Sequence, residues 1–417
     1  MAPTKQQLDH VRQLVSSLNL HGPIANCEVR PFSPALTSSL IAIDISTELP
    51  GGKQMVRNFV AKVKMENEDQ SEWVDADTQF YNECKVYSEV IPFFLKMIPS
   101  QGVSRIFPEC LYSSYTKVDP VVIIENLESK GFKMGDYGAM DYEHCALTLR
   151  TLAQFHSFSI AIKRKEPTLF KEKIAQLKDP RYADNTLIFR TIQMLTRVCV
   201  RGCINSFEMF YPEYSATYAV ELQKLLKLLN ESVGELFQSL VKAEEPFSVL
   251  CHGDFNRNNI LFRYDDDAKP CEVKFIDFQI IRYASPAIDI SLLLFLNTTS
   301  EFRAENEDKL LRIYHQTLLE NTATFLGCTT AELLSEMSLD KFKTDYARHA
   351  LHGFLISAMF SRFVFGSEEE CDRFVETIDN GRCTEDDLET LLPIGGEFVQ
   401  RRICDMLKDI LIRGYFK

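Results

Sequence analysis

Residues 251–262 read CHGDFNRNNILF, and a second short stretch, residues 274–279, reads KFIDFQ. Asp254 and Asn259 lie five residues apart in the first stretch, and Asp277 follows the apolar end of the second. The two apolar runs, separated by a short acidic segment, predict a hairpin, which brings the loop before one strand close to the loop after its partner. The pattern therefore predicts that the three polar side chains surround one cleft.

These residue types suit phosphoryl transfer to a hydroxyl group. The attacking alcohol needs a carboxylate that accepts its proton and orients its oxygen. Magnesium prefers hard oxygen ligands, usually one or two protein carboxylates or amides together with phosphate oxygens. A lone H-x-D would be explained more simply as a polar loop. The full pattern of H-x-D-x-x-x-x-N, a hairpin and I-D-F is far more specific, and we interpret it as catalytic.

The two stretches resemble the catalytic loop and metal-binding aspartate of the kinase-like small-molecule phosphotransferases, which include aminoglycoside phosphotransferases and choline kinases. They are more similar still to the ecdysteroid kinase-like, or CHK kinase-like, family. In that family H-G-D-x-x-x-x-N-I-L-F is followed by I-D-F-Q and then by R-Y-x-S-P-x-x-D-[IL]. This chain has IDFQ at 276–279 and RYASPAIDI at 282–290. Glutamine after I-D-F, where protein kinases carry glycine, argues against a protein kinase.

The resemblance implies a role for each polar residue of the motif. Asp254 is expected to be the catalytic base, and Asn259 and Asp277 are expected to hold magnesium. His252 is expected to brace the loop. Asp289, which opens an apolar helix, is expected to cap that helix or to tie the catalytic loop in place.

The first part of the chain predicts a small sheet with one helix. The helix is expected over residues 75–90, with Pro92 ending it. The first two strands are joined through the turn at 50–52 and so predict a hairpin. Strands are expected over residues 41–45, 55–65, 110–113 and 121–125.

A lysine on the second strand is expected to bind nucleotide phosphates. With period two, Val60, Lys62 and Lys64 share one face, so Val60 is expected to contact adenine. Periodicity does not choose between the two lysines, but the family pattern favours Lys62. Glu83, followed by Tyr87 as in the family, is the carboxylate implied to hold that lysine. The alternatives are a surface lysine and an ordinary exposed glutamate.

Two further segments complete the expected nucleotide site. Residues 32–40 read FSPALTSSL and lack the glycines with which protein kinases cover the phosphates. Backbone amides or hydroxyls of Ser38 and Ser39 are expected to contact phosphate there. The hinge between lobes, whose backbone would pair with adenine, is expected at Glu125, Asn126 and Leu127.

The fold class implied is α+β, a protein-kinase-like two-lobe fold. We expect a small antiparallel-sheet N-lobe over residues 1–126 and a large, mainly helical C-lobe over residues 127–417. The acidic run 265–267 is interpreted as the exposed tip of a hairpin, with a metal site as the less common alternative. Helix-periodic segments are expected at 142–162, 216–241, 309–325, 339–363 and 398–412.

Composition narrows the class of protein. The 417 residues carry a net charge of −13 and no block of lysine and arginine, which argues against binding to nucleic acid or an anionic membrane. No apolar run approaches the ~20 residues of a membrane span. The 12 cysteines form no CxxC pair, which argues against a zinc site and favours reduced thiols. We therefore expect a cytoplasmic protein, and a monomer.

The sequence predicts an ATP- and Mg²⁺-dependent kinase that phosphorylates the hydroxyl of a small molecule. Family resemblance implies a steroid alcohol such as an ecdysteroid, with xenobiotic alcohols second and cationic alcohols third. An aromatic pocket lining would favour the steroid, and acidic residues would favour a cation. The glycine-free loop keeps one alternative open, a catalytically weak pseudokinase that binds a hormone or metabolite.

Overall fold

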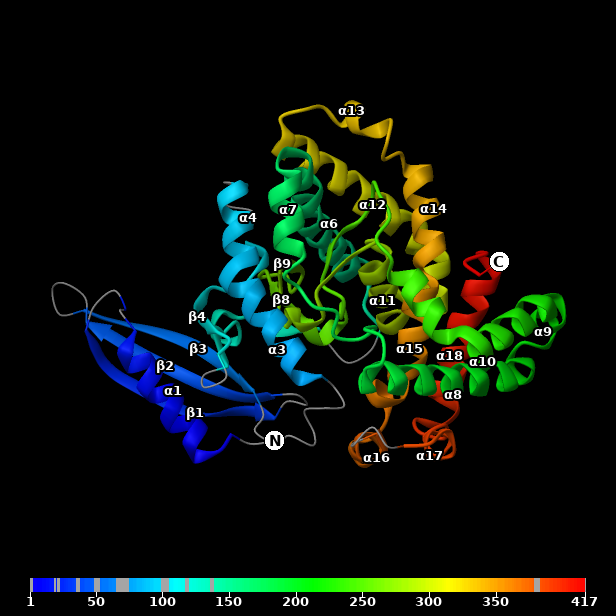
Figure 1. The fold of residues 1–417 in the computed structure, drawn as a ribbon, viewed down its shortest axis with the longest axis horizontal. Helices are drawn as coiled ribbons and strands as arrows, with labels where there is room; N and C mark the ends of the chain where they lie inside the picture. The colour runs from blue at the N-terminus through cyan, green and yellow to red at the C-terminus, as the bar shows by residue number, and fades with distance from the viewer. Residues whose placement is uncertain are drawn as a thin grey trace.

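The structure is a computed structural model of the chain. It describes residues 3–18, 20, 23–34, 38–48, 53–64, 75–98, 105–116, 120–135, 139–378 and 383–416. A small sheet-rich lobe lies beside a larger lobe made mostly of helices (Figure 1). The predicted α+β, two-lobe kinase-like class is therefore confirmed.

The small lobe is built on a five-stranded antiparallel sheet in the order β1-β2-β3-β5-β4. One face of the sheet packs Ile43 and Phe59 against Val11 and Val15 of helix α1, which leaves the opposite face toward the second lobe. The element bounds are α1 Lys5–Ser17, β1 Ile24–Pro34, β2 Ser38–Glu48, β3 Gln54–Lys64, β4 Cys110–Ser114 and β5 Val121–Glu125.

The predicted hairpins are confirmed by the register of the strands. Leu40 of β2 pairs with Lys62 of β3, and Cys110 of β4 pairs with Ile124 of β5. Residues 50–52, where the first turn was expected, lie outside the described residues. Helix α1 and strand β1 were not predicted from the sequence.

The helix that carries Glu83 is longer than predicted. Helix α3, Ala76–Lys85, continues through a π-helical turn, Val86–Val90, into α4, Ile91–Met97. The expectation that Pro92 ends the helix is wrong. The wide π turn shifts the backbone hydrogen bonding by one residue, so Pro92 lies at the start of α4, where its missing N–H is not needed.

The large lobe consists of helices around a small β-island. Four predicted helices are confirmed with extended or shifted ends, and the predicted segment 339–363 is divided into two helices at Ala350. Helices α8 and α16 were not predicted. The bounds are α6 Tyr142–Lys165, α7 Pro167–Ile174, α8 Leu187–Phe210, α9 Pro212–Thr217, α10 Ala219–Val241, α11 Ala287–Asn297, α12 Ser300–Leu326, α13 Thr330–Leu334, α14 Leu339–His349, α15 Leu351–Phe365, α16 Glu368–Ile378, α17 Glu385–Glu389 and α18 Gly396–Ile412.

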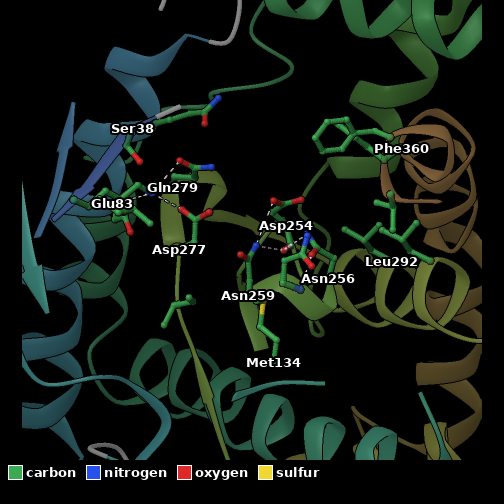
Figure 2. A pocket seen from close by; sticks show the side chains of 18 of the residues that line it. Ser38, Glu83, Met134, Asp254, Asn256, Asn259, Asp277, Gln279, Leu292 and Phe360 are labelled. Carbon is green, nitrogen blue, oxygen red and sulfur yellow. Dashed lines mark hydrogen bonds and ion pairs between the residues drawn. The ribbon is translucent and has the colours of Figure 1, made fainter. Parts of the chain in front are cut away.

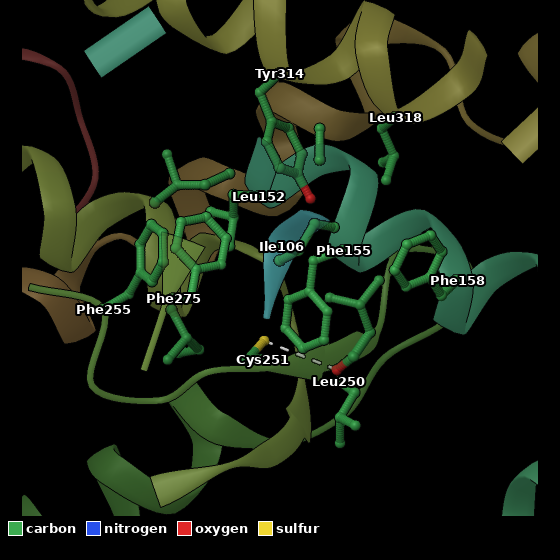
Figure 3. Packing of buried hydrophobic residues seen from close by; sticks show 14 of the residues in the cluster. Ile106, Leu152, Phe155, Phe158, Leu250, Cys251, Phe255, Phe275, Tyr314 and Leu318 are labelled. Atoms are coloured by element: carbon green, nitrogen blue, oxygen red, sulfur yellow. Dashed lines mark hydrogen bonds between the residues drawn. The ribbon is translucent and has the colours of Figure 1, made fainter. Parts of the chain in front are cut away.

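The β-island positions the catalytic motif on the helical core. Its strands form the sheets β6-β8-β9 and β7-β10. Phe255 and Phe275 are fully buried against Leu152 and Phe155 of α6, which anchors the loop between β7 and β8 (Figure 3). The bounds are β6 Lys133–Met134, β7 Val249–Cys251, β8 Ile260–Tyr264, β9 Pro270–Phe275 and β10 Arg282–Ala284.

The acidic run 265–267 forms the exposed turn between β8 and β9, as predicted. Asp265 accepts hydrogen bonds from the backbone N–H groups of Asp267 and Lys269, which closes the turn. Among the helices of the described residues, none is both long and apolar enough to cross a membrane.

Candidate active site

A cavity of about 770 Å³ lies between the lobes and is lined by residues from both. Asp254 and Asn259 lie at its centre, with Glu83 and Ser38 on the sheet side and Leu292 and Phe360 on the helical side (Figure 2). The volume lies within the range of about 300–1,000 Å³ typical of small-molecule sites. The cavity has a sheet-side part and a helical-side part, and the two parts meet at Asp254.

A glycine and a buried carboxylate hold the loop after β7 in one conformation. Gly253 has a φ of +83°, and a Cβ there would lie 2.0 Å from the carbonyl oxygen of Ile280, so only glycine fits. The carboxylate of Asp289 accepts hydrogen bonds from the backbone N–H groups of His252 (2.7 Å) and Gly253 (2.8 Å). Asp289 is fully buried at the start of α11, so it ties the catalytic loop to the helical core.

His252 braces the same loop against the end of β9. Its Nε2 lies 2.8 Å from the carbonyl oxygen of Ile276, the residue before Asp277. The backbone N–H of Ile276 donates to the carbonyl of Asn259 at 3.1 Å. These two contacts join the segments that carry Asn259 and Asp277, which lie 18 residues apart in the sequence.

Asp254 is positioned by an amide and a guanidinium. Asn259 Nδ2 lies 2.9 Å from the backbone carbonyl of Asp254 and 3.4 Å from its Oδ2. Arg181 Nη2 lies 3.3 Å from Asp254 Oδ1. The arginine side chain is 10% exposed and the aspartate side chain 20%, so the pair is largely shielded while the carboxylate still reaches the cavity.

Asp277 lies at the start of the short segment that follows β9. It has a φ of +66°, an unusual conformation for a residue other than glycine and one that often marks functional sites. Lys62 Nζ lies 2.7 Å from Asp277 Oδ1 and 2.6 Å from Glu83 Oε2. Gln279 Oε1 lies 3.4 Å from the same ammonium group. Lys62 therefore joins the sheet, helix α3 and the β-island.

Burial and charge act in opposite directions on this cluster. Burial alone would lower the pKa of Lys62, but the carboxylates of Asp277 and Glu83 outweigh it and hold that pKa above its ordinary value. Burial raises the pKa of Glu83 to about 7, because Lys62 only partly offsets the desolvation and Asp277 adds repulsion. One ammonium group is thus shared between two carboxylates.

The two lysines of β3 lie in different places. Lys62 lines the cavity with Val60, whereas Lys64 pairs with Asp77 at the surface. Ser38 also lines the cavity, and its buried hydroxyl has no hydrogen-bond partner among the described residues. Ser39 is not among the lining residues, because alternate side chains of β2 point to opposite faces of the sheet.

The proposed hinge also lies at the cavity. Its first residue ends β5 and the next two follow that strand, and all three line the space with the apolar side chains of Leu40, Val122 and Ile124. The carboxylate of Glu125 pairs with Lys130, and the backbone N–H of Asn126 donates to the carbonyl of Asn58 at 2.9 Å. The residues predicted to form the hinge are Glu125, Asn126 and Leu127.

A buried cluster of His156, Cys251 and Asp289 has atoms close enough to hold a metal ion. Its atoms are already used in hydrogen bonds. His156 Nδ1 lies 2.8 Å from the hydroxyl of Tyr314, and its Nε2 lies 3.2 Å from Asp289 Oδ2. Cys251 Sγ lies 3.3 Å from the backbone carbonyl oxygen of Ser285 and 3.6 Å from that of Ala284, so its S–H has acceptors there. The cluster supports the catalytic loop.

The family model of the ecdysteroid kinase-like family matches residues 35–326. The chain belongs to the ecdysteroid kinase-like family. A search of curated proteins finds no match to it. The matched segment contains Lys62, Glu83, Asp254, Asn259 and Asp277, so the family match and the cavity coincide.

Part of the site of this ecdysteroid kinase-like protein lies beyond the matched segment. Helices α15 and α16, which follow residue 326, line the helical side of the cavity together with α8 and α11. None of the lining residues on these four helices was predicted from the sequence.

Two contacts at the candidate site carry no signal in the sequence of this family member. Arg181 lies in the loop between α7 and α8, 73 residues before Asp254. Asn82, beside Glu83 on α3, exchanges hydrogen bonds with the backbone of Lys178 at 2.9 and 3.0 Å. The loop that carries Arg181 is therefore fixed to the helix that carries Glu83.

Proposed function

We propose that the protein is an ATP- and Mg²⁺-dependent phosphotransferase that acts on the hydroxyl of an apolar small molecule. The observation that carries this proposal is the shared cavity, in which Lys62, Asp254, Asn259 and Asp277 meet between a polar part and an apolar part. Kinase-like family membership supports the reaction class.

The sheet side of the cavity suits a nucleotide. Lys62 is positioned to bind phosphate oxygens, and the unpartnered hydroxyl of Ser38 is a ready donor to the same groups. Val60 and Ile124 offer an apolar surface for a base, beside the backbone of the hinge. We assign these contacts to a nucleotide-binding lobe over residues 1–126 and the remaining chain, residues 127–417, to the catalytic lobe.

The residues also fit a magnesium ion. Asp277 offers a carboxylate that is 26% exposed, and Asn259 uses its Nδ2 toward Asp254, which leaves its side-chain oxygen available. All of these ligand atoms are hard oxygens, as magnesium requires. When bound, the ion would offset negative charge on the phosphates.

Asp254 would act on the acceptor alcohol. It would accept the hydroxyl proton as the oxygen forms a bond to the γ-phosphorus and the bond from that phosphorus to the bridging oxygen of ADP breaks. Asn259 and Arg181 restrict the rotation of the Asp254 carboxylate, which favours in-line attack.

The helical side favours an uncharged acceptor over a cationic one. Apart from Asp254, its described lining residues include no carboxylate, so a cation would lose its hydration without gaining a partner. Three of the 30 phenylalanines, Phe360, Phe363 and Phe374, line it among aliphatic side chains. We therefore propose an acceptor with a steroid-like or similarly apolar body.

Replacing the catalytic carboxylate tests the proposal. Asp254→Ala should reduce phosphoryl transfer from labelled ATP to an alcohol panel by about 100- to 10,000-fold, because proton transfer and orientation are both lost. Asp266→Ala, on the exposed hairpin tip, is the matched control and should retain activity. Equal turnover by Asp254→Ala and the parent would exclude Asp254 as the base.

Binding of Mg-ATP separates the kinase from the pseudokinase. A ligand of the native state raises the unfolding midpoint, so millimolar Mg-ATP should stabilise the protein. Lys62→Met should weaken that shift. The absence of any shift in the parent protein would support a hormone- or metabolite-binding protein without transfer.

A further inference from the structure

The helical part of the cavity, here called the acceptor arm, has an almost wholly apolar wall. It extends from Asp254 between four helices, α8, α11, α15 and α16, and Leu292 and Phe360 face it in Figure 2. Most of these side chains are under 10% exposed, so the wall is packed from behind. The apolar lining is Ile188, Ile192, Leu195, Leu292, Leu296, Ile356, Met359, Phe360, Phe363, Val364, Phe374, Val375 and Ile378.

The few polar atoms of this wall are already engaged. Thr191 is the one hydroxyl residue among its described lining, and its Oγ1 donates to the backbone carbonyl of Leu187 at 3.1 Å. The sulfur of Met359 lies 2.9 Å from the hydroxyl of Thr196, which donates to it from behind the wall. Among its described residues, the wall therefore offers no side-chain donor that is free for a ligand.

The charged and amide side chains among the described residues of the arm lie at its mouth. Asp254 and Arg181 form the pair described above, and the guanidinium of Arg181 lies 5.9 Å from the ring centre of Phe360, where the apolar wall begins. Asn256 Nδ2 lies 3.3 Å from the carbonyl of Asp254, and its Oδ1 accepts from the backbone N–H of Asn258. The mouth thus matches a single polar end of a ligand.

We propose that the acceptor is an alcohol with its reactive hydroxyl at one end and an apolar body without further hydroxyls. This inference rests on the proposed phosphotransferase function and narrows its substrate class. Among steroid-sized alcohols, the arm selects those with few hydroxyls and discriminates against polyhydroxylated steroids.

The physical reason is that a second hydroxyl would lose its hydrogen bonds to water and gain none from the described side chains of the arm. A hydroxyl at the far end of the acceptor loses its hydrogen bonds to water when it enters the arm. The lining side chains that the structure describes offer no free donor in return. Discrimination by an apolar pocket against one added hydroxyl reaches about 100-fold in kcat/KM. The carboxylate of Asp254 already serves the reactive hydroxyl, so it gives no help at the far end.

A matched pair of acceptors tests the inference on the parent enzyme. 5α-Androstan-3β-ol and 5α-androstane-3β,17β-diol share one ring system and differ by one hydroxyl at the opposite end. With Mg-ATP, transfer is measured by mass gain of one phosphate, and ecdysone serves as the polyhydroxylated probe. We expect kcat/KM for the mono-ol to exceed that for the diol by about 10- to 100-fold, with ecdysone lower still.

A polar substitution in the wall should reverse part of this preference. Leu195→Gln adds an amide of similar size to α8, and Leu195→Met is its apolar control. We expect Leu195→Gln to reduce the ratio of mono-ol to diol by at least about 10-fold, while Leu195→Met keeps the parent ratio. Unfolding midpoints of both variants show whether the wall remains packed. If Leu195→Gln fails to fold, the ratio of kcat/KM for the mono-ol to that for the diol, measured on the parent enzyme, still tests the inference.

The outcomes separate this inference from the proposed function. Equal kcat/KM for the two steroids, or a preference for ecdysone or choline, would overturn the inference while leaving the kinase intact. Transfer to no alcohol at all would overturn the proposed function. In that case the dissociation constants of the mono-ol and the diol still test the preference of the arm. Tighter binding of the mono-ol supports the inference, and equal dissociation constants refute it.

Discussion

Glu83 makes the stability of the nucleotide-free protein depend on pH, and Glu83→Gln should remove that dependence. Burial raises the pKa of Glu83 from its ordinary 4.5 to about 7. The folded protein therefore binds this proton more tightly than the unfolded chain does. The stabilisation that Glu83 contributes is therefore fully present below pH 4.5, and it is lost as the pH rises through about 7.

The magnitude follows from the two pKa values. Their difference corresponds to roughly 3 kcal/mol of unfolding free energy, since each pH unit contributes about 1.36 kcal/mol. Glutamine at this position is neutral at every pH. The stability of Glu83→Gln relative to the parent should therefore increase by up to roughly 3 kcal/mol between pH 4.5 and 7.5, or about 3 °C in unfolding midpoint for a chain of this length.

Thermal unfolding of both proteins without nucleotide or magnesium, at steps from pH 4.5 to pH 7.5, measures this change. Glu89→Gln is the matched control on the same helical segment. Hydrogen bonds from Lys85 and Lys173 lower the pKa of Glu89, so its contribution is present at high pH and lost as the pH falls. The midpoint of Glu89→Gln relative to the parent should stay level or fall as the pH rises. A level or falling difference for Glu83→Gln would refute the reasoning.

Three further substitutions test the support of the catalytic loop. Arg181→Met should lower kcat at least about 10-fold with little change in the KM for ATP. Arg181→Lys should recover part of the lost kcat, and transfer assays with both variants would show these effects. Asp289→Ala should cost about 3–5 kcal/mol in urea unfolding, because two backbone N–H groups lose a buried charged acceptor; a loss under 1 kcal/mol would contradict this. Gly253→Ala should be far more destabilising than Gly131→Ala, since only at Gly253 does the added Cβ meet backbone, and similar midpoints would count against the clash.

Local patterns were sufficient to predict much of the small lobe and the catalytic motif. Buried and partly exposed side chains alternate along β3 from residue 58 to residue 64, and β2 and β3 pair in the antiparallel arrangement that the hairpin prediction requires. Motif spacing likewise placed Asp254, Asn259 and Asp277 in one loop system. Pro92 shows where local rules fail, because a proline is tolerated when a π turn precedes it.

The sequence by itself determined the fold class and the residue types of the candidate reaction, because strand period, turn residues and motif spacing act over short distances. Only the tertiary structure placed Lys62, which the family pattern favoured, at the cavity and Lys64 at the surface, left Ser39 out of the cavity lining and brought Arg181 to Asp254. It also assembled the acceptor arm from helices up to about 190 residues apart. Those contacts depend on how distant helices pack, and no short pattern in the chain encodes which faces meet.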